Sequence, residues 1–159
     1  MRTQGYKVFL THSWRLFFSK IIMTHTHQAV KALIKKDGKY LVLESTYWAD
    51  KILYHDLPWW RLSQWENEIE GLRREVMEEL WVEIEIWKYL WEWDFIRIDN
   101  IKVSCKTYLC KLTEENIDIT QNPSSDEDIL SVTWMTRAEL FNSKLFQWTN
   151  IYDIFKKLL

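Results

Sequence analysis

The stretch from residue 57 to residue 84, LPWWRLSQWENEIEGLRREVMEELWVEI, constrains the fold of this chain more than any other segment. Its apolar residues recur at helical spacing, which predicts an amphipathic helix over residues 67–80. The apolar stripe of that helix consists of Ile69, Leu72, Val76 and Leu80. This stripe is the face that the helix is expected to bury.

Three carboxylates flank the predicted buried stripe. On a wheel of 100° per residue, Glu79 lies about 40° and Glu78 about 60° from Glu75, on either side of it. Glu75 and Glu79 are one turn apart and can point at one object. Like charges placed in this way repel each other unless a cation lies between them, and Mg²⁺ accepts carboxylate oxygens together with substrate phosphates. The cluster is therefore either a metal site or a solvated acidic face.

The composition narrows the class of protein. A chain of 159 residues that is 47% hydrophobic and 28% charged suits one domain with a substantial core. The formal net charge is −2 with both signs mixed, so no nucleic-acid polymer is expected as a partner. No run of 18 apolar residues occurs, so no membrane partner is expected either.

The cysteines and histidines favour structural roles in a reducing compartment. Cys105 and Cys110 are five positions apart, which places them on opposite faces of an extended strand and argues against their pairing. Buried small hydrophobes in a cytoplasmic protein are the favoured interpretation. His25 and His27 could bind a metal, but no partner motif accompanies them.

The remaining segments predict an α/β fold, a mixed sheet sandwiched between helices. Residues 29–45 form two β-prone runs around Asp37-Gly38, a strong hairpin signal. Thr136 and Glu139 form a capping-box pattern at the start of a short helix. Further strands are expected at 51–58, 82–86, 89–98, 101–112 and 129–135, a loop at 122–128, and a closing helix at 147–158.

The first 22 residues stand apart from this pattern, since they are basic and contain no acid. They lack the apolar core and cleavage site of a secretory signal, which leaves two interpretations. One is an amphipathic targeting segment, and the other is upstream sequence translated before a true start at Met23. The second is favoured, so residues 1–22 are treated as an extension and residues 23–159 as a single domain.

Glu75, Glu78 and Glu79, which form the acidic flank of the predicted helix, are part of a longer pattern that begins at Trp60 and ends at Val82. The pattern resembles the Nudix box, G-x5-E-x7-R-E-U-x-E-E-x-G-U, in which U is an aliphatic residue. Every position other than the two glycines is matched, by Glu66, Arg74, Glu75, Val76, Glu78, Glu79 and Val82. Both glycine positions hold tryptophan. The resemblance extends over residues 24–158, with the order of elements expected of the family.

This resemblance implies a Nudix-like fold and Mg²⁺-dependent hydrolysis of a diphosphate linkage in a nucleoside diphosphate derivative. Glu75 and Glu79 would be the principal ligands of Mg²⁺, or alternatively of Mn²⁺, with Glu78 as a further ligand or the base that positions water. Arg74 would pair with Glu66 and hold the loop against the helix. The partner would be a small-molecule nucleotide, and a homodimer is a possible assembly.

Family members also take an extra acid from a loop far along the chain. The candidates are Asp126, Glu127 and Asp128, of which Glu127 is preferred. The other interpretation is a solvated loop acid.

Tryptophan stands where the family has glycine. The chain holds 3 glycines and 11 tryptophans. A chain of this length should carry roughly 11 glycines at the usual share of about 7%. The affected positions of the box region are Trp59, Trp60, Trp65 and Trp81. Trp81 falls where a helix usually ends in a left-handed residue, and the other three are expected to crowd the loop that approaches phosphate.

Three interpretations of these tryptophans compete. They could stack on a base, although stacking explains one or two indoles and not every motif glycine. The chain could be a catalytically impaired binding module, although decay would not spare all the chemical positions. The favoured interpretation is that UGA codons read as glycine were translated as tryptophan. Trp48, Trp87 and Trp91 would then be glycines as well, whereas Trp134 is interpreted as a true core residue.

Overall fold

The computed structural model describes residues 26–47, 52–96, 101–121, 127–147 and 152–158. Its strands are β1 Thr26–Lys36, β2 Lys39–Tyr47, β3 Leu53–Asp56, β4 Trp59–Arg61, β5 Ile84–Ile96, β6 Lys102–Leu112 and β7 Glu127–Thr136. Its helices are α2 Glu68–Leu80, α3 Arg137–Asn142, α4 Lys144–Gln147 and α5 Tyr152–Leu158, with the short 3-10 helix η1 Ile119–Gln121. Within these ranges no helix is long and apolar enough to cross a membrane. The predicted extension, His25, Trp48 and Asp126 lie outside the described residues.

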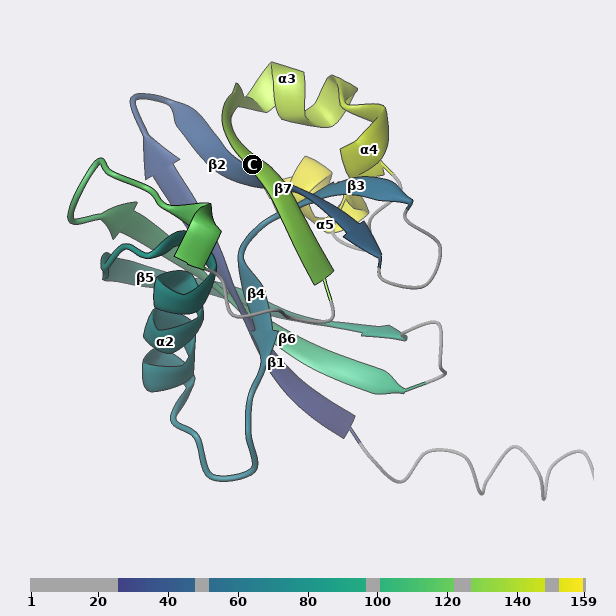
Figure 1. Cartoon of the computed structure of the whole chain (residues 1–159). Helices are drawn as coiled ribbons and strands as arrows, with labels where there is room; N and C mark the ends of the chain where they lie inside the picture. The colour runs from purple at the N-terminus through teal and green to yellow at the C-terminus, as the bar shows by residue number, and fades with distance from the viewer. Residues whose placement is uncertain (1–25, 48–51, 97–100, 122–126, 148–151, 159) are drawn as a thin grey trace, which may run out of the picture.

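The strands form one mixed sheet in the order β3-β2-β1-β6-β5, with β4 paired to β1 and β7 paired to β2 (Figure 1). β1 and β6 run parallel, from Thr26 opposite Lys102 to Ile34 opposite Cys110, and the other pairs are antiparallel. The predicted hairpin is present, because Asp37 and Gly38 both have positive φ, 49° and 76°, as a tight hairpin turn of this kind requires.

Helices cover both faces of the sheet, as the sequence predicts (Figure 1). On one face α2 buries its apolar stripe against β1, and on the other face α3, α4 and α5 gather. Successive residues of a strand point to opposite faces, so β6 contributes Cys105 to one core and Cys110 to the other. Both thiols are fully buried, and burial raises the pKa of each to about 12, which makes them unreactive.

Four local predictions were wrong in their details. Residues 59–61 form the strand β4 instead of a loop. Three residues are too few to show the alternation of apolar and polar residues from which a strand is predicted. The strands expected at 82–86 and 89–98 form the single strand β5. The pairing of β5 with β6 shifts in register at Trp87 and Leu90, and these irregularities interrupt the alternation of apolar and polar residues within the strand. The predicted loop 122–128 ends early, because Glu127 already belongs to β7. Gln147 belongs to α4, separate from the predicted closing helix, which is present as α5.

The ends of α2 agree with the sequence. Asn67 is its N-cap, and the Asn67 side chain accepts a hydrogen bond from the Ile69 amide at 2.9 Å. At the other end Trp81 adopts a left-handed conformation, with φ 52° and ψ 41°, and its amide donates to the Met77 carbonyl at 2.9 Å. The left-handed helix end predicted at Trp81 is therefore confirmed.

We expect Trp81→Gly to raise the free energy of unfolding by about 1 kcal/mol, because the strain of a left-handed residue with a Cβ atom exceeds the chain entropy that glycine adds. The Trp81 side chain is 55% exposed, so little packing is lost. The melting temperature should rise by about 3 °C. Trp65→Gly is the matched control, because Trp65 is 92% exposed and lacks positive φ. A lower melting temperature for Trp81→Gly would show that the indole contributes more than the strain costs.

Candidate active site

Arg74 lies at the centre of the acidic flank of α2. Its Nε donates to Glu66 Oε1 at 2.7 Å, and its Nη1 donates to Glu78 Oε2 at 3.0 Å and also to Glu75 Oε1. Glu66 belongs to the loop ahead of the helix, where its Oε2 accepts from the Ser63 amide at 3.1 Å. The guanidinium therefore ties the loop to the helix and places one positive charge against three carboxyl groups.

The carboxylates of this flank differ in exposure. Glu75 is 2% exposed, one oxygen of Glu79 is buried, and Glu78 is partly open to solvent. Burial raises the pKa of Glu75 to about 7, although the charge of Arg74 acts in the opposite direction. The hydrogen bond from Arg74 lowers the pKa of Glu66. The flank thus combines a buried carboxyl that resists ionisation with the ion pair between Arg74 and Glu66.

The residue types of this flank fit a hard divalent cation, since three carboxylates supply the oxygen ligands that Mg²⁺ prefers. Across the described ranges, no group of three His, Cys, Asp or Glu side chains is arranged around one metal position. Instead Arg74 supplies the positive charge that lies against Glu75 and Glu78. The convergence of Glu75 and Glu79 on one cation stays a prediction.

Trp59 and Trp60 point to opposite faces of the sheet from β4, since adjacent strand residues alternate. Trp60 pairs with Val30, and its ring lies 5.7 Å from the Arg74 guanidinium carbon. Trp59 pairs with Lys31, whose ammonium lies 5.2 Å from the Trp59 ring. Of these two indoles, therefore, Trp60 is the one that crowds the acidic flank. The expected crowding by Trp65 was wrong, because that side chain points into solvent.

Gly71 is a feature of the site that the sequence analysis did not identify. A Cβ atom there would lie 2.5 Å from Leu62 Cδ2 and 3.1 Å from Glu66 Cδ. Glycine in a helix interior costs roughly 1 kcal/mol relative to alanine, so its presence calls for a reason. The reason is the close approach of the Glu66 loop to α2, and an isolated glycine inside a helical pattern was the available signal.

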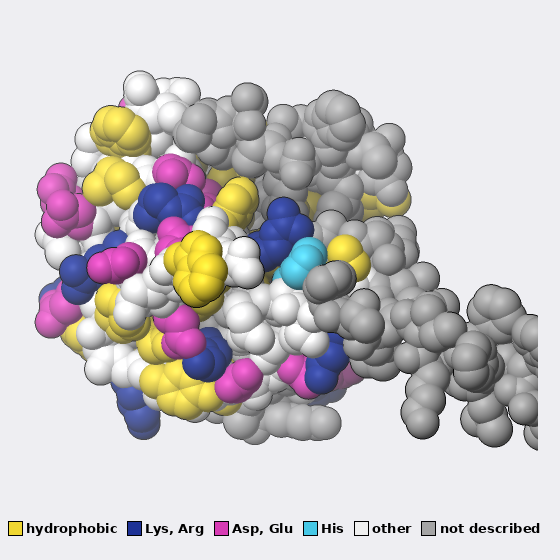
Figure 2. Space-filling model, turned by 90° about the horizontal axis from the view of Figure 1, so that it is seen from below, with side chains coloured by type: hydrophobic (Ala, Val, Ile, Leu, Met, Phe, Trp, Pro, Cys, Tyr) yellow, Lys and Arg dark blue, Asp and Glu magenta, His cyan; other side chains and the backbone are white. Residues whose placement is uncertain are grey.

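A second polar cluster ties the start of α2 to β6. The Tyr108 hydroxyl donates to Glu68 Oε2 at 2.6 Å, and the Lys106 ammonium binds the other oxygen of the same carboxylate. No local pattern links these residues, because they are about forty positions apart. On the face seen in Figure 2, basic and acidic side chains lie intermixed.

Glu127, the proposed extra acid, is the first residue of β7, where it pairs with Tyr47 of β2. Its side chain, like that of Asp128, lies outside the part of the chain that the structure describes. The role of Glu127 stays a prediction.

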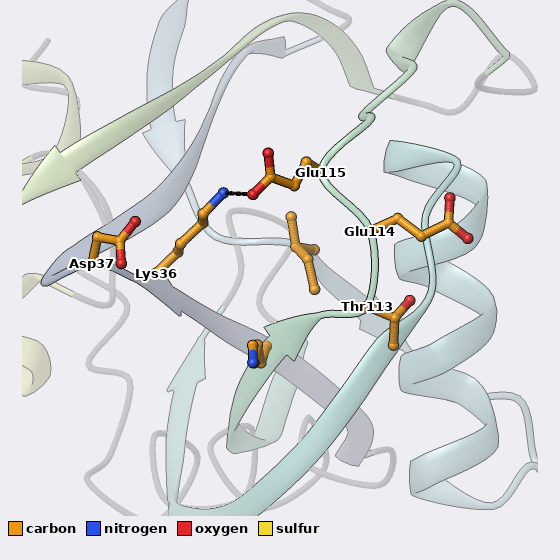
Figure 3. A pocket seen from close by; sticks show the side chains of 7 residues that line it. Lys36, Asp37, Thr113, Glu114 and Glu115 are labelled. Atoms are coloured by element: carbon orange, nitrogen blue, oxygen red, sulfur yellow. Dashed lines mark hydrogen bonds and ion pairs between the residues drawn. The ribbon is translucent and has the colours of Figure 1, made fainter.

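A cavity of about 450 Å³ lies away from the box, where the β1–β2 hairpin meets the end of β6 (Figure 3). It is lined by Lys36, Asp37, Lys111, Leu112, Thr113, Glu114 and Glu115. Lys36 and Glu115 form an ion pair at 2.5 Å, but their side chains are 41% and 85% exposed. The cavity contains no box residue, so it does not serve the acidic flank.

Comparison with known proteins agrees with this geometry. The NUDIX domain family model matches residues 25–158, and the chain therefore belongs to the Nudix hydrolase family, a family of pyrophosphohydrolases. None of the curated proteins matches the sequence. The resemblance inferred from the box is thus confirmed at the level of the family.

Solved structures show the same fold. A NUDIX hydrolase from Nitrosomonas europaea is 17% identical, with 84% of this chain and 87% of that chain covered and a TM-score of 0.71. The MutT NUDIX hydrolase from Burkholderia pseudomallei is 19% identical, with 86% and 99% covered and a TM-score of 0.70. An Ap4A hydrolase from C. elegans is 16% identical, with 82% and 93% covered and a TM-score of 0.62. The predicted Nudix fold is confirmed.

The stability of the metal-free chain should depend on the ionisation of Glu75. Its pKa is raised from 4.5 to about 7 in the folded state, so its contribution is favourable below pH 4.5 and is lost as the pH rises through 7. The loss should reach roughly 3 kcal/mol above pH 8.

Thermal melts in EDTA at pH 5 and pH 8 measure this effect. Glu75→Gln should gain stability relative to the parent chain at pH 8 and much less at pH 5. If Glu75→Gln and the parent chain differ in melting temperature by the same amount at pH 5 and at pH 8, the effect assigned to burial of Glu75 is contradicted.

Proposed function

We propose that the chain hydrolyses the diphosphate linkage of a nucleoside diphosphate derivative at the acidic flank of α2. The proposed substrates are nucleoside triphosphates, ADP-sugars and dinucleoside polyphosphates. The observation that carries this is the cluster in which Arg74 binds Glu66, Glu75 and Glu78 beside a buried oxygen of Glu79. The matched family supports the reaction class. The match begins at residue 25, which supports residues 23–159 as the functional domain.

Glu75, Glu78 and Glu79 would hold a divalent cation, Mg²⁺ or Mn²⁺. When bound, such a cation neutralises charge on the diphosphate and lowers the pKa of a water molecule. Arg74 fixes the loop through Glu66 and keeps the acidic flank from repelling itself. Glu78 is the partly exposed carboxylate, which suits a group that takes a proton from water. Glu127 is a candidate for a further acid.

A second candidate function is a nucleotide-binding module with impaired catalysis. The observation that favours it is the Trp60 indole over Arg74, which adds bulk at the acidic flank. Small misplacements of catalytic groups can cost about 10²-fold in rate. Both candidates share the fold and differ in turnover.

A turnover screen separates the two functions. The chain is incubated with nucleoside triphosphates, ADP-sugars and dinucleoside polyphosphates, and release of pyrophosphate or nucleoside monophosphate is measured with Mg²⁺, with Mn²⁺ and with EDTA. Cation-dependent turnover that Glu78→Gln removes supports the hydrolase. Nucleotide binding without turnover in any condition supports the binding module and contradicts the hydrolase.

A further inference from the structure

Two residues of β6 hold the first turn of α2 against the sheet. Glu68 begins the helix, and both oxygens of its carboxylate are bound. The Tyr108 hydroxyl donates to Glu68 Oε2 at 2.6 Å, and the Lys106 ammonium binds Glu68 Oε1. Burial acts to raise the pKa of Glu68, but the hydrogen bonds from these two partners outweigh it, so the pKa is lowered. We call these three residues the Glu68 clamp.

The strand side of the clamp belongs to the interior of the sheet. β6 lies between β1 and β5, so its backbone is paired on both edges. Tyr108 is 7% exposed, and the Tyr89 ring of β5 meets the Tyr108 ring edge to face, with centroids 5.6 Å apart. Lys106 pairs with Val30 of β1. The clamp therefore fastens the start of α2 to a strand that is itself held from both sides.

The clamp lies in line with two carboxylates of the acidic flank. An α-helix turns by about 100° and rises by about 1.5 Å per residue. Glu75 therefore lies about 20° to one side of Glu68 and about 10 Å further along α2. Glu79 lies about 20° to the other side and about 16 Å further along. A rotation or a slide of the helix at Glu68 would carry both carboxylates with it.

The apolar stripe of α2 sets this line less tightly than the clamp does. Leu72, Val76 and Leu80 pack in the core, but apolar contact is non-directional. Hydrogen bonds to an ionised carboxylate are short and directional. The pair of Lys106 with Glu68 is partly exposed, at 28% and 36% of the two side chains, so it adds little to stability. The main effect of the clamp is therefore to orient the helix.

We propose that Lys106 and Tyr108 are positioning residues that hold α2 so that Glu75 and Glu79 meet at one divalent cation. In this role they act through Glu68 and do not touch the substrate. The inference rests on the proposed function, and it adds two residues from outside the box on which the geometry of the cation site depends.

Calorimetric titration of the full chain with Mn²⁺ tests this role, because binding of the cation does not require turnover. Lys106→Met removes the ammonium and keeps the apolar stem, and Tyr108→Phe removes the hydroxyl and keeps the ring. Each should weaken Mn²⁺ binding about tenfold, the lower end of the range for residues that orient metal ligands. Each should also lower kcat about tenfold with KM unchanged, at saturating Mn²⁺ and on a substrate that the parent chain hydrolyses. Lys106→Arg, which keeps the cation, should retain most of the affinity.

Lys102→Met is the matched control. Lys102 also belongs to β6, and it binds Asp94 of β5 at 2.7 Å in an ion pair that is likewise partly exposed and does not include α2. This variant should change the melting temperature about as much as Lys106→Met does, and it should leave Mn²⁺ affinity and kcat unchanged. Glu68→Gln combined with Lys106→Met should lose no more affinity than either alone, because both break the same ion pair.

Unchanged Mn²⁺ affinity in Lys106→Met and Tyr108→Phe, or an equal loss in Lys102→Met, would overturn the proposal. Additive losses in the double variant would do the same, since the two residues would then act separately. Loss of the fold in both single variants would make the clamp structural and would count against the proposal as well. A parent chain that binds no Mn²⁺ would overturn it together with the cation site. Weaker Mn²⁺ binding in a chain without turnover would support the positioning role and remove only the proposed hydrolase.

Discussion

Replacing Trp59, Trp60, Trp65 and Trp81 together by glycine should raise Mg²⁺-dependent turnover by at least about 10²-fold. Trp60 lies over the Arg74 guanidinium, and its removal frees space at the acidic flank. Trp81 is strained at the end of the helix that carries the carboxylates, so glycine should let this helix end relax. The measurement is turnover of both chains on one substrate panel, at equal and saturating Mg²⁺.

Stability gives a second readout of the same fourfold variant. Trp59 and Trp60 are half-buried and make ring contacts, so their loss should offset part of the gain at position 81. The variant with glycine at 60 and 81 alone keeps Trp59 in place, so it tests the two tryptophans next to the acidic flank and the end of α2 without loss of the ring contacts of Trp59. A parent chain that is both more active and more stable would show that the tryptophans are native, and UGG codons at these positions would lead to the same conclusion.

Glu79→Gln should retain the fold and lose most cation-dependent activity. The substitution keeps the shape of the side chain and removes the negative charge expected to bind the cation. The loss should be roughly 10²- to 10³-fold, the range seen when one electrostatic contact to a reacting group is removed. Turnover and the melting temperature are measured with and without Mg²⁺.

Glu70→Gln is the matched control for this substitution, because Glu70 is an exposed residue of the same helix at a variable position of the box. It should retain both activity and the stabilisation by Mg²⁺. Unchanged turnover in Glu79→Gln would remove Glu79 from the mechanism.

Local features of the fold could be predicted because their causes are local. The apolar stripe and Asn67 fix where α2 begins, and the Asp37-Gly38 dipeptide fixes the hairpin, since its positive φ values suit few other residue types. The capping box at Thr136 and Glu139 is likewise contained within four residues, and the structure shows both of its hydrogen bonds. The pairing of Arg74 with Glu66 was implied by the resemblance to the Nudix box, and the structure shows it.

Features that depend on distant parts of the chain could not be predicted in this way. Lys31 meets Asp56 because β4, which begins three residues after Asp56, pairs with β1. Glu68 meets Tyr108 because the start of α2 lies next to β6. In both pairs, the residues next to one member in the sequence do not indicate which residue its side chain will bind. β4 escaped prediction for another reason, because its pairing with β1 stabilises three residues that have no strand pattern of their own.

The parallel pairing of β1 with β6 has a consequence for synthesis of the chain. The two strands that form the centre of the sheet are joined by a connection that includes β2, β3, β4, α2 and β5. The ribosome adds roughly 5–20 residues per second, so β1 waits on the order of 4–15 seconds for the last paired residue of β6. During that interval α2 has no finished sheet on which to bury its apolar stripe. Slow closure of the centre of the sheet should therefore leave apolar surface exposed on the nascent chain and limit its yield when it is overproduced.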